Sequence, residues 1–155
     1  MLNSSQIATL KTLVMNEGSL ASAIANVDDQ AVADWLNADS GTKGWITEFT
    51  TAQLLDALNW TAFIGRSVGE RDALQFMFRE GFVNTGRTNI QQGLSDIFSG
   101  TATAAVNQRA ALVAAAQRPV SRAEKALASK LVNGAYVLVF EGEVSPGEAS
   151  TITRG

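Results

Sequence analysis

The sequence predicts a mainly α, single-domain helical bundle over residues 1–155, with one or two short β-strands near the C-terminal third. Three observations predict this fold class. Proline occurs only twice in the 155 residues, so that almost no position forbids a helix interior. Apolar residues recur at intervals of three and four along most of the chain, as one buried helix face requires. Capping boxes, in which Ser or Thr precedes Glu or Gln by three residues, indicate helix starts at Ser67, Thr88, Ser121 and Ser145.

The apolar spacing and these caps divide the chain into short helices. Ile90, Leu94 and Ile97 give the clearest example, because they follow the i, i+4, i+7 rule and Gly100 then ends the run. We expect helices from Ile7 to Gly18, from Asp28 or Asp29 to Leu36, from Thr50 or Thr51 to Leu58, from Glu70 to Gly81, from Ile90 to Gly100, from Thr103 to Gln117 and from Arg122 to Lys130. A short C-terminal helix is expected at about 146–152, with Pro146 at the first helical position, where its missing N–H does no harm.

One segment near the C-terminus is typical of a strand rather than a helix. Residues Ala135–Phe140 are largely β-branched or aromatic, and glycines flank them, so we expect a strand at about 135–141. A lone strand leaves its backbone N–H and C=O groups unpaired and needs a partner. The sequence leaves three partners open: the segment Trp45–Phe49, the segment Ala62–Ile64, or another chain.

The composition excludes most catalytic chemistry. Cysteine and histidine are both absent, which excludes disulfide scaffolds, Cys/His zinc sites, thiol nucleophiles, Ser–His triads and histidine general bases. The 12 basic and 15 acidic residues leave a net charge of −3, and 46% of the residues are hydrophobic. This balance excludes a disordered tail and a strongly basic nucleic-acid coat protein. We therefore predict that the protein is not an enzyme and has no catalytic residue, no cofactor and no metal site.

Three polar motifs have a functional and a structural interpretation. Asp28 and Asp29 are candidates for paired acids, but N-capping of the following helix explains them better. Glu141 and Glu143 are candidates for binding calcium, or they belong to a solvated turn. The segment Gly65–Gly69 has the composition of an anion site at a helix N-terminus. It lacks the lysine and the spacing of a P-loop, which favours a simple helix entry.

The charges are unevenly distributed along the chain. Residues 1–60 hold two basic and seven acidic residues, a net of −5, whereas residues 61–155 hold ten basic and eight acidic residues, a net of +2. Such an asymmetry suits a subunit that meets its neighbour through complementary faces, and solvated helix surfaces are the alternative. Arg118, Arg122 and Lys125 gather near one helix start, so we predict a polar or DNA-facing patch there.

Several strings of the sequence resemble a group of structural proteins encoded by tailed bacteriophages and prophages. The longest is Phe63–Phe78. The likeness continues through Gly81–Asn84, Asn89–Gly93, Asp96–Gly100, Ser121–Lys125 and Glu141–Gly142, and Asp28–Asn37 is similar too. The chain departs from the group at two places. Asn84-Thr85-Gly86 stands where the relatives have an Asn-Pro-Ser turn, and Leu131–Gly134 is a shortened form of a loop rich in glycine and threonine.

The resemblance implies a virion structural protein of a tailed bacteriophage, namely a head–tail connector or neck (adaptor) subunit that assembles into a ring. The implied partners are copies of itself, neighbouring portal or tail components and, without sequence specificity, packaged DNA. Pairing of the C-terminal strand between subunits makes Tyr136, Val137, Leu138, Val139, Phe140 and Glu141 interface candidates. The alternatives are a structural protein of the tail module and a small phage-encoded DNA-binding regulatory protein.

The expected location follows from the same resemblance and from the N-terminus. No basic region followed by an apolar stretch opens the chain, and no apolar run approaches the roughly 20 residues that span a bilayer. We therefore expect synthesis in the cytoplasm of the bacterial host, incorporation into the virion, and no membrane partner.

Overall fold

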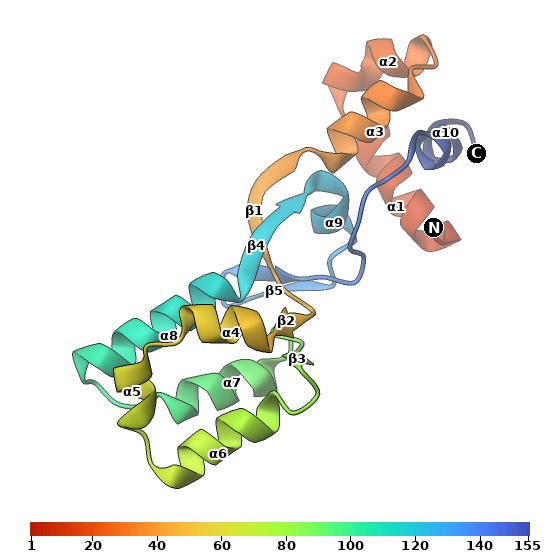
Figure 1. Ribbon diagram of the computed structural model, residues 1–155. Helices are drawn as coiled ribbons and strands as arrows, with labels where there is room; N and C mark the ends of the chain where they lie inside the picture. Colours follow the sequence, from red (N-terminus) through yellow and green to blue (C-terminus); the bar gives the residue numbers. More distant parts are fainter. The chain divides into compact units, whose positions relative to one another are not determined.

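The computed structural model describes residues 1–155 and is mainly helical, as predicted (Figure 1). It contains ten α-helices, one 3-10 helix and six short strands. The chain forms two compact units, each assembled from separate stretches. Unit 1 comprises Met1–Thr42, Pro119–Leu131 and Leu138–Gly155, and unit 2 comprises Lys43–Arg118 and Val132–Val137. Because the stretches alternate along the chain, no single cut separates the units, and the prediction of one domain over residues 1–155 stays a prediction.

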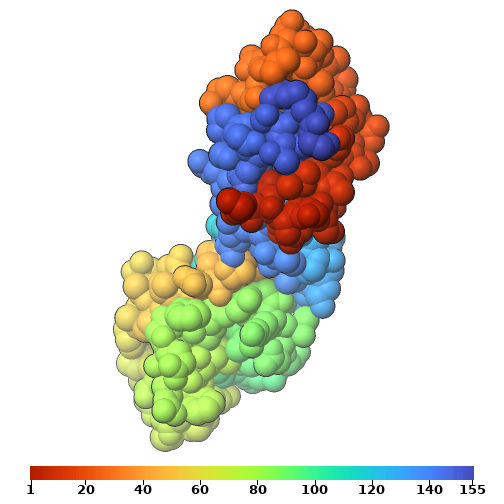
Figure 2. Space-filling model, turned by 90° about the vertical axis from the view of Figure 1, so that its right-hand side faces the viewer, coloured from red at the N-terminus to blue at the C-terminus, as the bar shows by residue number.

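Unit 1 brings the two ends of the chain together. Its helices are α1 (Ser4–Met15), the 3-10 helix η1 (Gly18–Leu20), α2 (Ala21–Ala25), α3 (Asp29–Asn37), α9 (Arg122–Leu127) and α10 (Pro146–Arg154). The C-terminal helix α10 packs against α1 and α3, and the C-terminal residues lie against the N-terminal ones in Figure 2. The predicted C-terminal helix at about 146–152 is thereby confirmed and extends to Arg154.

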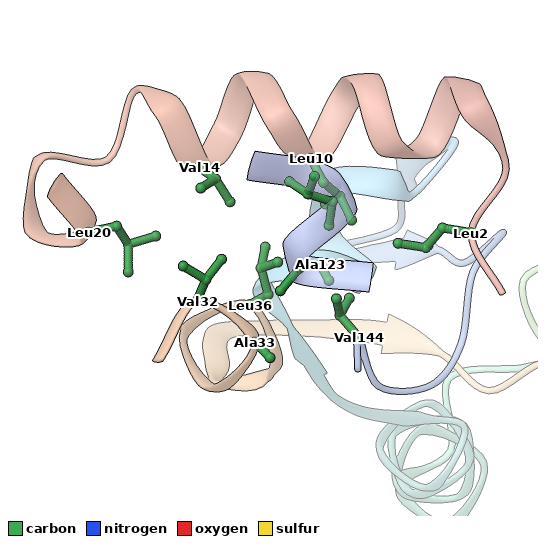
Figure 3. Close-up of a cluster of buried hydrophobic side chains, with 11 residues drawn as sticks. Leu2, Leu10, Val14, Leu20, Val32, Ala33, Leu36, Ala123 and Val144 are labelled. Atoms are coloured by element: carbon green, nitrogen blue, oxygen red, sulfur yellow. The ribbon is translucent and has the colours of Figure 1, made fainter. Parts of the chain in front are cut away.

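The core of unit 1 consists of aliphatic side chains from these helices. Leu10 and Val14 of α1 point toward Val32 and Leu36 of α3, and all four are buried (Figure 3). Ile152 contributes the corresponding apolar residue from α10 and is fully buried. Leu10 and Val14, like Val32 and Leu36, are four residues apart and so lie on the same face of their helix. One face of α1 can therefore be buried against one face of α3.

Unit 2 is a second helical cluster with an aromatic core. Its helices are α4 (Thr51–Ala57), α5 (Trp60–Ile64), α6 (Val68–Met77), α7 (Thr88–Ile97) and α8 (Thr103–Ala115), and the strands β2 (Phe49–Thr50) and β3 (Phe82–Val83) pair antiparallel within it. Phe49 and Phe98 are fully buried. Phe78 meets Phe49 edge to face, with ring centroids 6.0 Å apart. Such contacts between aromatic rings stabilise the packing beyond the area that they bury.

The remaining strands form a four-stranded sheet in the order β4-β1-β6-β5. These strands are β1 (Asp39–Trp45), β4 (Gln117–Ser121), β5 (Lys130–Val132) and β6 (Ala135–Val137). The predicted C-terminal strand is β6, which starts where expected but ends at Val137 rather than near residue 141. It runs parallel to β1, with Gly44 opposite Tyr136 and Trp45 opposite Val137. The partner is therefore β1, which shares only Trp45 with the predicted segment Trp45–Phe49. The alternative segment Ala62–Ile64 is wrong, because these residues belong to α5.

The capping boxes are confirmed at three of the four predicted positions. Ser67, Ser121 and Ser145 accept hydrogen bonds from the backbone N–H of the glutamate three residues later, and each glutamate closes the box. The prediction at Thr88 is wrong: Arg87 precedes the helix and no side chain caps it. Thr88 is instead the first residue inside α7, and the Gln91 Oε1 that would close a box accepts from the Asn133 side-chain amide at 2.7 Å.

Candidate functional site

The predicted interface strand pairs within the chain. Because β6 lies between β1 and β5 in the sheet, both of its edges already have partners. Main-chain pairing with a second chain through Tyr136 and Val137 is therefore not available, and the sheet leaves only the outer edges of β4 and β5 for such pairing. Beyond the strand, Leu138 is buried, Phe140 packs against the core of unit 1, and Val139 and Glu141 are exposed. The six predicted residues do not form one continuous exposed edge.

The three residues of the predicted polar patch belong to different units, and each has an interaction within the chain. Arg118 belongs to unit 2, whereas Arg122 and Lys125 belong to unit 1. The guanidinium of Arg122 lies over the indole ring of Trp35, 4.7 Å from the ring centroid, and its Nη1 donates to the Trp35 carbonyl oxygen at 2.9 Å. Arg118 and Lys125 are half-buried and each has an interaction within the chain. The geometry thus explains Arg122 as a residue that joins α9 to α3.

The paired aspartates act as helix-end residues, as the capping interpretation predicts. Asp28 accepts a hydrogen bond from the Ala31 N–H at the start of α3. Asp29 forms a double contact with the guanidinium of Arg154, at 2.8 and 2.6 Å. This contact holds the pKa of Asp29 below its ordinary value. The two carboxylates therefore face different partners and do not form an acid pair.

The other polar motifs also have structural roles. Gly65 ends α5 and Ser67 caps α6, so the segment Gly65–Gly69 consists of the link between two helices and the first two residues of α6. Glu141 and Glu143 are both exposed after β6. Across the whole chain, no group of three or more Asp, Glu, His or Cys side chains is placed to hold a metal ion.

One feature that the sequence analysis missed is a cavity of about 430 Å³ in unit 2. We call it the α7–α8 cavity, because α7 and α8 supply most of its walls. Its lining includes Trp45, Gln91, Leu94, Arg109, Leu112 and Val113. Nη1 of Arg109 donates to the carbonyl oxygens of Phe98 and Gly100. The cavity therefore combines apolar side chains, polar side chains of α7 such as Gln91 and Ser95, and one cation held in place by the loop that follows α7.

A second missed feature is a set of exposed apolar side chains on α5 and α6. Trp60 and Ile64 stand on α5, and Val68 and Phe76 stand on α6. Phe76 is 74% exposed and Val68 is 64% exposed. The apolar pattern contained a signal for this surface, because Leu74 and Phe78 face the core, and Phe76 lies between them on another face of the helix.

No protein-family model, no curated protein and no solved structure matches this chain. None of the ten helices combines the length and the apolar character that crossing a membrane requires.

Proposed function

We propose that this protein is a virion structural protein of a tailed bacteriophage, a head–tail connector or neck subunit that acts by assembling with copies of itself into a ring. The proposal includes no reaction of its own and no cofactor. It draws on the resemblance of segments such as Phe63–Phe78 to phage structural proteins. The chain's location in this proposal is the virion, with portal or tail components as neighbours.

The observation that carries the proposal is the exposed apolar surface of α5 and α6. Trp60, Ile64, Val68 and Phe76 are large side chains, each more than half exposed. Burying one such side chain contributes roughly 1.5–3 kcal/mol to an association. The four side chains stand on two helices that follow one another in the chain, and exposed apolar patches are typical of protein–protein contact sites. In an isolated chain this apolar surface stays in contact with water. In a ring, each contact between neighbouring copies would bury it.

The charge distribution gives further support. Unit 1 holds five basic and nine acidic residues, a net of −4, and unit 2 holds seven basic and six acidic residues, a net of +1. Opposite potentials on separate parts of a subunit favour a fixed register between neighbours. A structural protein of the tail module would use the same features.

The test is the protein content of purified particles. We expect mass spectrometry of intact virions to find the chain at several copies per particle, measured against the major capsid protein. Disruption of the gene is expected to give heads and tails that do not join, and a plasmid copy is expected to restore joining. Absence of the chain from particles overturns the proposal. A shift of duplex DNA at low salt by a chain that particles lack favours the DNA-binding regulator instead.

A further inference from the structure

We propose that neighbouring copies join head to tail, with one face of α6 from one copy seated in the α7–α8 cavity of the next. The face consists of Val68, Asp72 and Phe76 and is called the α6 ridge below. This inference rests on the proposed ring assembly and identifies the contact that would build it.

The α6 ridge is a continuous exposed stripe on one helix. Val68, Asp72 and Phe76 follow one another at intervals of four residues, so that they occupy the same face on successive turns. All three are exposed, and Phe76 is among the most exposed of the large apolar side chains. The opposite face of α6 is occupied, because Leu74 is buried in the core of unit 2. The ridge therefore has no partner within the chain.

The α7–α8 cavity has the size and the wall that the ridge requires. An apolar cavity of about 150 Å³ accommodates a benzene ring. The α7–α8 cavity, at about 430 Å³, has room for the Phe76 ring and for a second ridge side chain. Leu94 and Leu112 supply apolar contacts, and Val113, 46% exposed, stands on the wall and loses its solvent contact when the cavity is filled.

The charges of the two surfaces are complementary. Arg109 lines the cavity, and only its Nη1 has hydrogen-bond partners in the chain, the two loop carbonyls. Asp72 lies in the middle of the ridge and has no ion pair within the chain. In the proposed contact, Asp72 of the ridge would therefore face Arg109 of the cavity, and the apolar ridge side chains would face the cavity leucines. This match selects a second copy of the chain as the occupant of the cavity.

The ridge and the cavity are different faces of unit 2. Gly93 of α7 is turned toward α6, where an added Cβ would come within 2.7 Å of the Met77 methyl. The cavity lies on another face of α7, which carries Thr88, Gln91 and Ser95. A contact between two different surfaces leaves each copy with one free ridge and one free cavity. Such head-to-tail contacts continue until they close into a ring.

The test uses one variant on each surface and a matched control. Phe76→Ser removes the ridge aromatic, and Val113→Glu places a charge in the cavity wall. Val106→Glu is the control, because Val106 lies on the same helix, is 43% exposed and does not line the cavity. Circular dichroism first establishes that all three variants are folded. Sedimentation velocity is expected to show that Phe76→Ser and Val113→Glu lower the association constant tenfold or more, while Val106→Glu associates as the original chain does.

Mixing the two variants distinguishes this contact from a symmetric one. Phe76→Ser retains an intact cavity and Val113→Glu retains an intact ridge, so an equimolar mixture is expected to form dimers that do not grow. A mixture that stays monomeric, a Val113→Glu chain that associates normally, or an original chain that is monomeric at every concentration overturns the proposed contact. If virions nevertheless contain the chain, the proposed function stands and only the contact is wrong. If virions lack it, the proposed function is wrong as well.

Discussion

Replacing Arg122 separates a structural role of this residue from the predicted DNA-facing one. The side chain of Arg122 stacks on the Trp35 ring and donates to the Trp35 carbonyl, which joins α9 to α3. Lysine keeps the positive charge at this position but lacks the planar guanidinium that makes both contacts. Arg122→Lys and Arg122→Ala therefore test geometry and charge separately.

The magnitude follows from the two contacts. A cation–π contact at a partly exposed site contributes about 0.5–1 kcal/mol. A hydrogen bond with a charged donor contributes about 1.5–3 kcal/mol, and the half-buried position of Arg122 places it at the lower end. We expect Arg122→Ala to lower the free energy of unfolding by about 2 kcal/mol. We expect Arg122→Lys to lower it by about 1 kcal/mol, because lysine retains part of the cation–π attraction.

The assay is urea unfolding at neutral pH, followed by circular dichroism, with duplex DNA binding measured in parallel at about 50 and 200 mM salt. Lys130→Ala is the control, because Lys130 is an exposed cation of the same unit whose side chain has no hydrogen bond or ion pair in the chain. The structural role predicts that both Arg122 variants are less stable than the control. The opposite result is that both variants unfold at the same urea concentration as the original chain, and that Arg122→Lys binds DNA normally whereas Arg122→Ala does not. This result refutes the structural reasoning and shows that the patch contacts DNA through its charge.

Three further changes test the local structure. Gln108→Leu is expected to lower the free energy of unfolding by about 2–4 kcal/mol, because the buried Gln108 amide binds two backbone groups in the α4–α5 link that would be left unpaired. Asn107→Leu, at an exposed position of the same helix, is the control, and equal urea midpoints for the two would contradict this role. Ser67→Ala is expected to cost about 1 kcal/mol, because Ser67 caps α6, whereas Thr88→Ala is expected to leave the urea midpoint nearly unchanged. The pKa of Glu148 is lowered by hydrogen bonds from the backbone, so its carboxylate stabilises the fold above the ordinary pKa of 4.5, and this stabilisation is lost as pH falls through the lowered value. Urea titrations from pH 7 to about pH 3 compare the free energy of unfolding of Glu148→Gln with that of the original chain. We expect the deficit of the variant to be largest at neutral pH and to shrink as the pH falls, and a deficit that does not change with pH would contradict this linkage.

The positions of most helices could be predicted because the signals are local. Ser67 and Glu70 are three residues apart, and both halves of their capping box lie within one helical turn. The same local rule failed at Thr88, because the side-chain oxygen of Gln91 accepts a hydrogen bond from Asn133, a residue far along the chain. A short-range pattern cannot include that competition.

The strands and the candidate site depended on distant residues. β1 contains glycine and polar residues and has no apolar alternation, so nothing in its own composition indicated a strand. Its pairing with β6 supplies the hydrogen bonds that make it one. Arg122 was correctly identified as a basic residue near a helix start, but the presence of Trp35 beneath it depends on how α9 and α3 meet. The sequence therefore indicated a charge without indicating its partner.

The sequence by itself determined the helical class, most helix starts and the absence of thiol and imidazole chemistry, because each follows from composition or from residues within one or two turns. Only the tertiary structure decided which strand pairs with β6, that Arg122 is held by Trp35, and that α7 and α8 enclose a cavity beside Arg109. The physical reason is that each of these features is a contact between elements far apart in the chain. Apolar periodicity states that a helix face is buried but not against what, so the α6 ridge and its proposed acceptor became visible only when the helices were packed together.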